Sequence, residues 1–193
     1  LAHRAARASL PPVIDFIEIH NDSRLSDRVL AERLDVEVGE RLDVRALEAS
    51  IQTIYGLENF EKVSYSLVES AGGTGVRLNA RAKSWGPDYL QFGMRLEDDF
   101  DGDANYTLAM AYTRTEMNAL GAEWRSQVAA GQEPLVFTEW YQPLDTGGRW
   151  FVNPSAAWSR QDFSEFSGSQ EVARFNLEEW RLGFAAGREF GQW

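Results

Sequence analysis

The densest chemical grouping in this sequence is a run of carboxylates, Glu97-Asp98-Asp99-Phe100-Asp101-Gly102-Asp103. Clustered carboxylates beside a glycine can bind a hard cation such as Ca²⁺. The run lacks the full spacing of an EF-hand loop and its closing glutamate. We therefore interpret the segment from Asp98 to Asp103 as a solvated loop tip between two strands, and keep cation binding as the alternative.

Other catalytic or metal-binding side chains are scarce. The two histidines, His3 and His20, have no second histidine three or four residues away, so a histidine metal site or catalytic triad is not indicated. Glu178 and Glu179 do not form an acid–base pair, because neighbours on a strand point to opposite faces. With no cysteine in the chain, thiolate sites are excluded. We expect no cofactor and no bound metal.

Charge and hydropathy exclude two further classes. The net charge of −11 argues against nucleic acid as a partner, because phosphates need a basic surface. No run of 18 apolar residues is present, which excludes a transmembrane helix. A transmembrane β-barrel is not excluded, because its strands are short and only half apolar.

The stretch from Asn105 to Gly131 alternates strictly between two kinds of side chain. Period-two alternation predicts strands with two different environments, and Asn118-Ala119-Leu120-Gly121 between the two arms is typical of a turn. One predicted face is large and apolar, and the other is small or charged. A transmembrane barrel would turn the first face to lipid and the second to a wet lumen. A soluble β-sandwich remains the alternative.

The alternation extends over the whole second half of the chain. The side chains expected to face lipid are Leu90, Phe92, Met94, Tyr106, Leu108, Met110, Tyr112, Trp124, Trp180, Leu182 and Phe184. Those expected to face the lumen are Arg95, Glu123, Arg125, Glu139 and Arg181. Inward charges have two interpretations, a lumen that passes an unfolded polypeptide or simple inter-strand salt pairing. Both can hold at once.

Turn-forming residues divide residues 85–193 into six predicted antiparallel strands. The predicted segments are Tyr89 to Glu97, the two arms of the Asn105–Gly131 hairpin, Leu135 to Leu144, Trp150 to Arg160 and Arg174 to Gly187, with a polar loop from Gln161 to Glu171. Six strands cannot close a spanning barrel, whose smallest form has about eight. We expect residues 85–193 to be the first part of an incomplete barrel.

The first half predicts a separate α+β domain over residues 13–84, preceded by a linker at 1–12. Strands are expected from Val13 to His20, from Phe60 to Glu69 and from Val76 to Ala82. Helices are expected from Asp27 to Leu34, with Ser26 as N-cap, and after Asp43 up to Tyr55. Gly56 stands where a left-handed C′ glycine belongs, with Leu57 placed for the accompanying Schellman contact. The predicted order is β-α-α-β-β.

Two resemblances follow from these motifs. The segment from Asn21 to Tyr65, with its capped helix, its Gly56-Leu57 step and the alternation of Phe60, Val63 and Tyr65, resembles a POTRA domain. The Trp85-Gly86-Pro87 entry, the turn from Asn118 to Arg125 and the sequence Tyr141-Gln142-Pro143-Leu144 resemble the start of an Omp85-type outer-membrane barrel, and are most similar to the C-terminal half of patatin-like phospholipase autotransporters.

The resemblance implies a function in type V secretion. A periplasmic POTRA domain and an outer-membrane barrel would export or display an upstream lipase domain. The implied partners are outer-membrane lipid, the barrel-assembly machinery, and either the chain's own upstream passenger or an unfolded polypeptide. No serine here lies in a Gly-x-Ser-x-Gly elbow, so we expect no enzyme activity in this part of the protein. Alternatives are an Omp85 or two-partner-secretion translocase or insertase for a separate protein, and a soluble β-sandwich binding protein.

Overall fold

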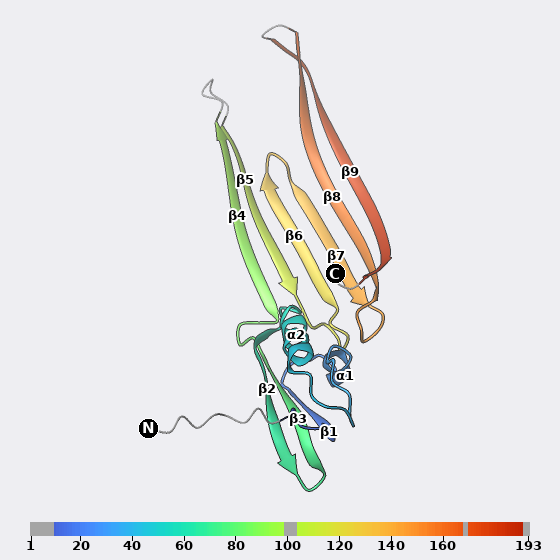
Figure 1. The fold of residues 1–193 in the computed structure, drawn as a ribbon. Coiled ribbons are helices and arrows are strands. Elements are labelled where there is room, and N and C mark those ends of the chain that lie inside the picture. Colours follow the sequence, from blue (N-terminus) through green and yellow to red (C-terminus); the bar gives the residue numbers. More distant parts are fainter. Residues whose placement is uncertain (1–9, 99–103, 168–169, 191–193) are drawn as a thin grey trace, which may run out of the picture. The chain divides into compact units, whose positions relative to one another are not determined.

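The structure is a computed structural model that describes residues 10–98, 104–167 and 170–190. The chain divides into two compact units, Leu1–Ser84 and Trp85–Trp193. Figure 1 shows the two helices within the first unit and the long strands of the second. Most of the acidic run expected to form a loop tip or a cation site falls at residues 99–103 and lies outside the described residues.

The first unit has the predicted β-α-α-β-β order. Its elements are β1 (Phe16–Asn21), α1 (Asp27–Ala31), α2 (Val44–Tyr55), β2 (Phe60–Ser70) and β3 (Gly73–Ala82). The sheet order is β1-β3-β2, with β1 parallel and β2 antiparallel to β3. The last strand enters the middle of the sheet, so β1 and β2 form its edges.

The core of this unit is formed by one face of the sheet and the apolar stripe of α2. Leu47 and Ile54 of α2 are fully buried, as are Phe60, Val76 and Leu78 of the sheet. Spacing at i, i+4 and i+7 from Leu47 brings Ile51 and Ile54 onto the same side of the helix. Burial of these side chains supplies the main stabilisation of the unit.

Two local predictions in this unit are wrong. Gly56 ends α2 with right-handed geometry, φ −64°, and the left-handed residue is Glu58 at φ 60°. The N–H groups of Gly56, Leu57 and Glu58 still bond to carbonyls of the last turn, so no left-handed glycine is required there. Helix α1 ends at Ala31, because the N–H groups of Arg33 and Leu34 bond to carbonyls three residues back rather than four.

The second unit is a six-stranded antiparallel meander, as predicted. Its strands are β4 (Asp88–Asp98), β5 (Ala104–Arg114), β6 (Glu123–Gly131), β7 (Leu135–Pro143), β8 (Trp150–Ser167) and β9 (Gln170–Arg188), hydrogen-bonded in chain order. Within the described residues the sheet is open, because β4 and β9 each pair with one neighbour. No helix in the described part of the chain is long and apolar enough to cross a membrane.

The loop predicted from Gln161 to Glu171 is wrong. Strand pairing of β8 with β9 continues from Arg160↔Glu178 out to Ser167↔Gln170, so this segment is a two-stranded ribbon. The ladder is formed by main-chain groups and does not require apolar side chains, which is why a polar composition misled the prediction. In Figure 1 the β8–β9 hairpin extends well past the short hairpin of β6 and β7.

The predicted turn between β5 and β6 is confirmed, and Asn118 organises it. Its side-chain oxygen accepts hydrogen bonds from the N–H groups of Leu120 (3.0 Å) and Ala122 (3.2 Å). Its side-chain nitrogen donates to Oε1 of Gln142 at 2.8 Å, which ties the turn to the end of β7. Gly121 has φ 82°, a conformation that glycine adopts without steric cost.

Candidate functional site

The strand register separates the side chains of the second unit into two faces. Met94 pairs with Leu108, Met110 with both Phe92 and Val128, and Trp158 with Trp180, so even-numbered residues share one face. All eleven residues expected to face lipid lie on this apolar face. Many are highly exposed, up to 86% for Leu182, so neighbours within the described residues do not cover them.

A cluster of polar atoms on the apolar face is hydrogen-bonded within that face. The indole N–H of Trp124 donates to the Thr138 hydroxyl at 2.8 Å, and that hydroxyl lies 2.9 Å from the Ser126 hydroxyl. The Tyr112 and Trp124 rings meet edge to face with centroids 5.8 Å apart. A polar group that is already hydrogen-bonded costs far less to transfer from water to an apolar medium.

The length of the apolar face along the strands and the tilt of those strands are close to those of outer-membrane barrels. From Trp150 to Trp158, strand β8 rises about 26 Å at ~3.3 Å per residue, close to the ~25 Å apolar band of outer-membrane barrels. Followed from strand to strand through the paired residues, Gly183 in the middle of the apolar stretch of β9 aligns with Tyr89 of β4. Tyr89 lies about four residues before the middle of the apolar stretch of β4. With strands ~4.8 Å apart, this offset along the strands corresponds to a strand tilt of about 30°.

The apolar face ends at the cross-strand pair Trp158 and Trp180, whose ring centroids are 6.4 Å apart. One step further out, the same face carries Arg160 opposite Glu178. On the ribbon beyond, the exposed apolar pair Phe163 and Phe175 belongs to the opposite, odd-numbered face. The polarity of the two faces therefore inverts where the predicted membrane band stops.

The opposite face is polar and carries paired charges. All five residues expected to face the lumen, Arg95, Glu123, Arg125, Glu139 and Arg181, are odd-numbered and lie on this face. Arg125 donates to Glu139 across the β6–β7 pair at 3.0 Å. Arg181 donates twice to Glu179 on its own strand, both at 2.6 Å. The structure thus contains the inter-strand salt pairing that was one of the two interpretations of these charges.

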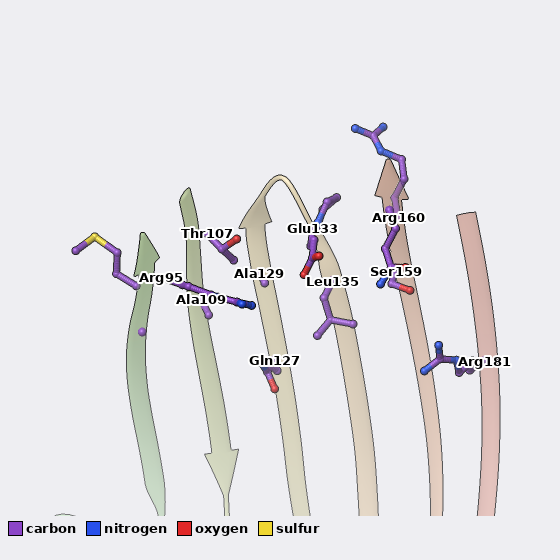
Figure 2. A pocket seen from close by; sticks show the side chains of 14 residues that line it. Arg95, Thr107, Ala109, Gln127, Ala129, Glu133, Leu135, Ser159, Arg160 and Arg181 are labelled. Carbon is purple, nitrogen blue, oxygen red and sulfur yellow. The ribbon is translucent and has the colours of Figure 1, made fainter. Parts of the chain in front are cut away.

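Two hollows on this face are lined by charged and polar side chains, in the larger one together with small and apolar residues. The larger, of about 490 Å³, is lined by Arg95, Thr107, Gln127, Glu133, Ser159 and Arg181 among others. Figure 2 shows Arg95 reaching from β4 across β5, and Arg181 reaching from β9 toward β8. The second, of about 380 Å³, is lined by Glu123, Arg125, Glu139, Tyr141 and Asn153.

The hollows include residues that the sequence analysis did not select. Asn153 donates to the second carboxylate oxygen of Glu139 at 3.3 Å, completing an Arg–Glu–Asn arrangement. Asn153 and Tyr141 share the odd numbering of the selected charges, which was the available signal. No group of three or more histidine, aspartate or glutamate side chains could hold a metal among the residues that the structure describes.

Close packing on the polar face depends on Gly187. A Cβ atom at this position would lie 2.6 Å from the Phe151 ring, which therefore sits directly over the β9 backbone. The Phe151 ring also packs against Tyr141, with centroids 5.3 Å apart. At Gly93 on β4, by contrast, the nearest atom to an added Cβ would be the Ala109 Cβ at 3.9 Å.

No family model and no curated protein matches the chain. Solved structures match its fold. BamA from Haemophilus ducreyi, in a crystal structure lacking POTRA domains 1-3, covers 85% of the chain with a TM-score of 0.64 and 10% identity. CdiB from Acinetobacter baumannii (TM-score 0.53, 11% identity) and CdiB from Escherichia coli (0.51, 16%) each cover 89%.

The likeness is one of fold, and it extends over part of those proteins. The chain spans 30% of the BamA chain and 34% and 33% of the two CdiB chains. The chain therefore has the fold of a barrel fragment of BamA and CdiB, as the sequence predicted. The similarity to patatin-like autotransporters remains a prediction.

Proposed function

We propose that this chain is part of an outer-membrane protein that moves polypeptide, with a POTRA domain over residues 13–84 in the periplasm and the first barrel strands over residues 85–193. In this proposal the apolar face contacts lipid and the polar face lines a wet passage. The observation that carries it is the two-faced sheet, with a continuous exposed apolar band on one side and paired charges on the other.

A translocase or insertase for a separate polypeptide is the form we favour. The fold likeness is to BamA and CdiB, and it supports this alternative over an autotransporter that carries its own lipase. Under either form, the charged side chains of the polar face keep the passage wetted. The edge strands β1 and β2 of the first unit could each add an extended chain by main-chain hydrogen bonds.

The membrane part is tested with spin labels on the whole protein in lipid vesicles. Labels at Leu108 and Met110 should be accessible to lipid-dissolved oxygen. Labels at Ala109 and Ala111, on the same strand but the opposite face, should be accessible to an aqueous nickel reagent. Equal aqueous accessibility at all four positions would contradict the membrane assignment and favour a soluble sandwich.

The transport part is tested with a photo-crosslinking residue in living cells. At Gln127, which lines the larger hollow, the crosslinker should capture a polypeptide in transit, whereas at the neighbouring Ser126 on the apolar face it should not. Mass spectrometry of the captured segment then distinguishes an upstream part of the same chain from a separate partner. Absence of any polypeptide adduct at Gln127 would contradict transport along this face.

A further inference from the structure

One cation on the apolar face is held by aromatic rings. The guanidinium of Arg188, near the end of β9, lies 5.5 Å from the centroid of the Trp150 ring and 5.1 Å from that of Phe190. Trp150 is the direct cross-strand partner of Arg188, so the two side chains share one face. Both rings are more than half exposed, at 53% and 73%, and Arg188 is itself exposed.

The carboxylates around Arg188 are engaged elsewhere. Asp145 accepts hydrogen bonds from the N–H groups of Trp150 (2.8 Å) and Arg149 (3.3 Å), and pairs with the Arg149 side chain at 3.6 Å. Glu189 accepts from the Tyr141 hydroxyl at 3.5 Å on the opposite face. Within the described residues, no carboxylate lies within ion-pairing distance of Arg188.

The other cation at this end of the apolar face shows the contrast. Arg114, at the end of β5, pairs with Asp88 at 3.7 Å. Arg114 is thus neutralised by the protein, whereas Arg188 keeps its charge available at the edge of an apolar surface. Against lipid, a guanidinium without a counter-ion would be costly, and stacking on two rings would offset only part of that cost.

Arg188 lies at one of the two boundaries of the apolar face, and the strand order shows which one. In an antiparallel meander the end of β9 lies at the same sheet edge as the start of β4, the strand that follows the first unit. If the first unit is periplasmic, as proposed above, this edge meets the inner leaflet of the outer membrane. Phospholipid phosphates lie at that depth, just outside the apolar band.

We propose that Arg188, Trp150 and Phe190 form a binding site for the phosphate of an anionic phospholipid. The guanidinium donates to the phosphate oxygens in its planar fork, and the two rings hold it in place while contacting the adjoining acyl region. The site rests on the proposed membrane orientation. It would anchor this end of β8 and β9 at a fixed depth in the membrane.

The test measures lipid retention by native mass spectrometry of the whole barrel protein, released from nanodiscs of POPG and POPC in equal amounts. The wild type should retain POPG over POPC, and Arg188→Gln should lower that preference by about fivefold. Arg188→Lys, which keeps the charge but loses the planar fork, should fall between them. Trp150→Leu should also weaken the preference.

The matched control is Arg149→Gln, which removes the same charge one residue from Trp150, from a side chain that Asp145 already neutralises. It should leave the preference unchanged.

An equal loss in both glutamine variants, or no loss in Arg188→Gln, would overturn the site. Displacement of POPG by excess inorganic phosphate would assign the site to free phosphate and overturn the lipid. Failure of the wild type to enter nanodiscs would overturn the proposed function as well, whereas entry without a POPG preference would overturn the site alone.

Discussion

At the scale of single residues, the two faces of the sheet impose opposite demands on polar atoms. Thr138 lies on the apolar face, yet its hydroxyl is hydrogen-bonded to Trp124, to Ser126 and to the Arg125 carbonyl. Glu139, the next residue, lies on the polar face and accepts from Arg125 and Asn153. One strand therefore presents a self-contained hydrogen-bond cluster to one side and an open polar surface to the other.

We predict that Thr138→Val destabilises the barrel by about 1–3 kcal/mol, because the Trp124 indole N–H loses its acceptor in an apolar environment. The measurement is denaturant unfolding of the whole protein in lipid vesicles. Thr113→Val, an equivalent change on the polar face of β5, is the control and should cost much less. Equal effects of the two substitutions would mean that the hydrogen bond from Trp124 to Thr138 does not add to the free energy of unfolding.

Gly187 gives a second prediction at this scale. Gly187→Ala should destabilise the barrel by about 1–3 kcal/mol, because the added methyl meets the Phe151 ring, which must move. Gly93→Ala, where the nearest atom is 3.9 Å away, should be near neutral. Adding Phe151→Leu to Gly187→Ala should recover part of the loss, and absence of any coupling between the two sites would refute the steric account.

At the scale of elements, the turn between β7 and β8 depends on a charged carboxylate. The N–H of Trp150 lowers the pKa of Asp145 below its usual 3.8. Desolvation opposes this shift, and the N–H and the charge of Arg149 add smaller contributions that lower the pKa further. Because the folded pKa is the lower one, the carboxylate stabilises the turn above the unfolded pKa. That stabilisation is lost as the pH falls through the folded pKa.

We therefore predict that Asp145→Asn lowers the melting temperature at neutral pH and changes it progressively less as the pH falls through the lowered pKa of Asp145, where Asp145 itself becomes protonated. Thermal melts of both proteins across this range measure the difference, which should shrink on the acid side. The carboxyl resonance of Asp145 should also titrate below that of a free aspartate. A difference between the two proteins that grew toward acid pH would contradict the assignment.

The elements also show what could be predicted from the sequence. Period-two alternation identified all six strands of the second unit and sorted Leu108 and Arg125 onto opposite faces, because alternation is a property of the strand itself. The extension of β8 past Arg160 was missed, since a solvated ribbon has no apolar stripe to indicate it. The geometry at Gly56 was missed because helix ends are determined by which carbonyls the following N–H groups reach.

The Arg188 cluster shows the same limit at the candidate site. Trp150 and Arg188 are 38 positions apart, and their pairing depends on the register of two long strands. Register is set by the hydrophobic pattern and by turn geometry, but alternation alone does not distinguish two registers that differ by two residues. Asn153 was missed for a related reason, because a neutral polar residue on the polar face has no distinguishing pattern until Glu139 is placed beside it.

At the scale of the whole molecule, the two units are stabilised in different ways. The first buries its own core, with Leu47, Ile54 and Phe60 completely covered. The second leaves its largest apolar side chains exposed and, within the described residues, has two unpaired sheet edges, β4 and β9. The first unit has a complete core of its own, whereas the proposed membrane location would give the second unit lipid on one face and further strands at both edges.

This difference predicts opposite behaviour for the two units when each is produced alone. Residues 10–84 should be soluble without detergent and unfold cooperatively, because the core is complete within them. Residues 85–193 should aggregate in water, and in micelles should not show the heat-modifiable migration of a closed barrel, because each unpaired edge exposes main-chain donors and acceptors to hydrocarbon. The whole protein is the control and should show that migration. A soluble, monomeric 85–193 fragment would refute the membrane assignment, since its apolar face would then have to be covered by a second layer of its own.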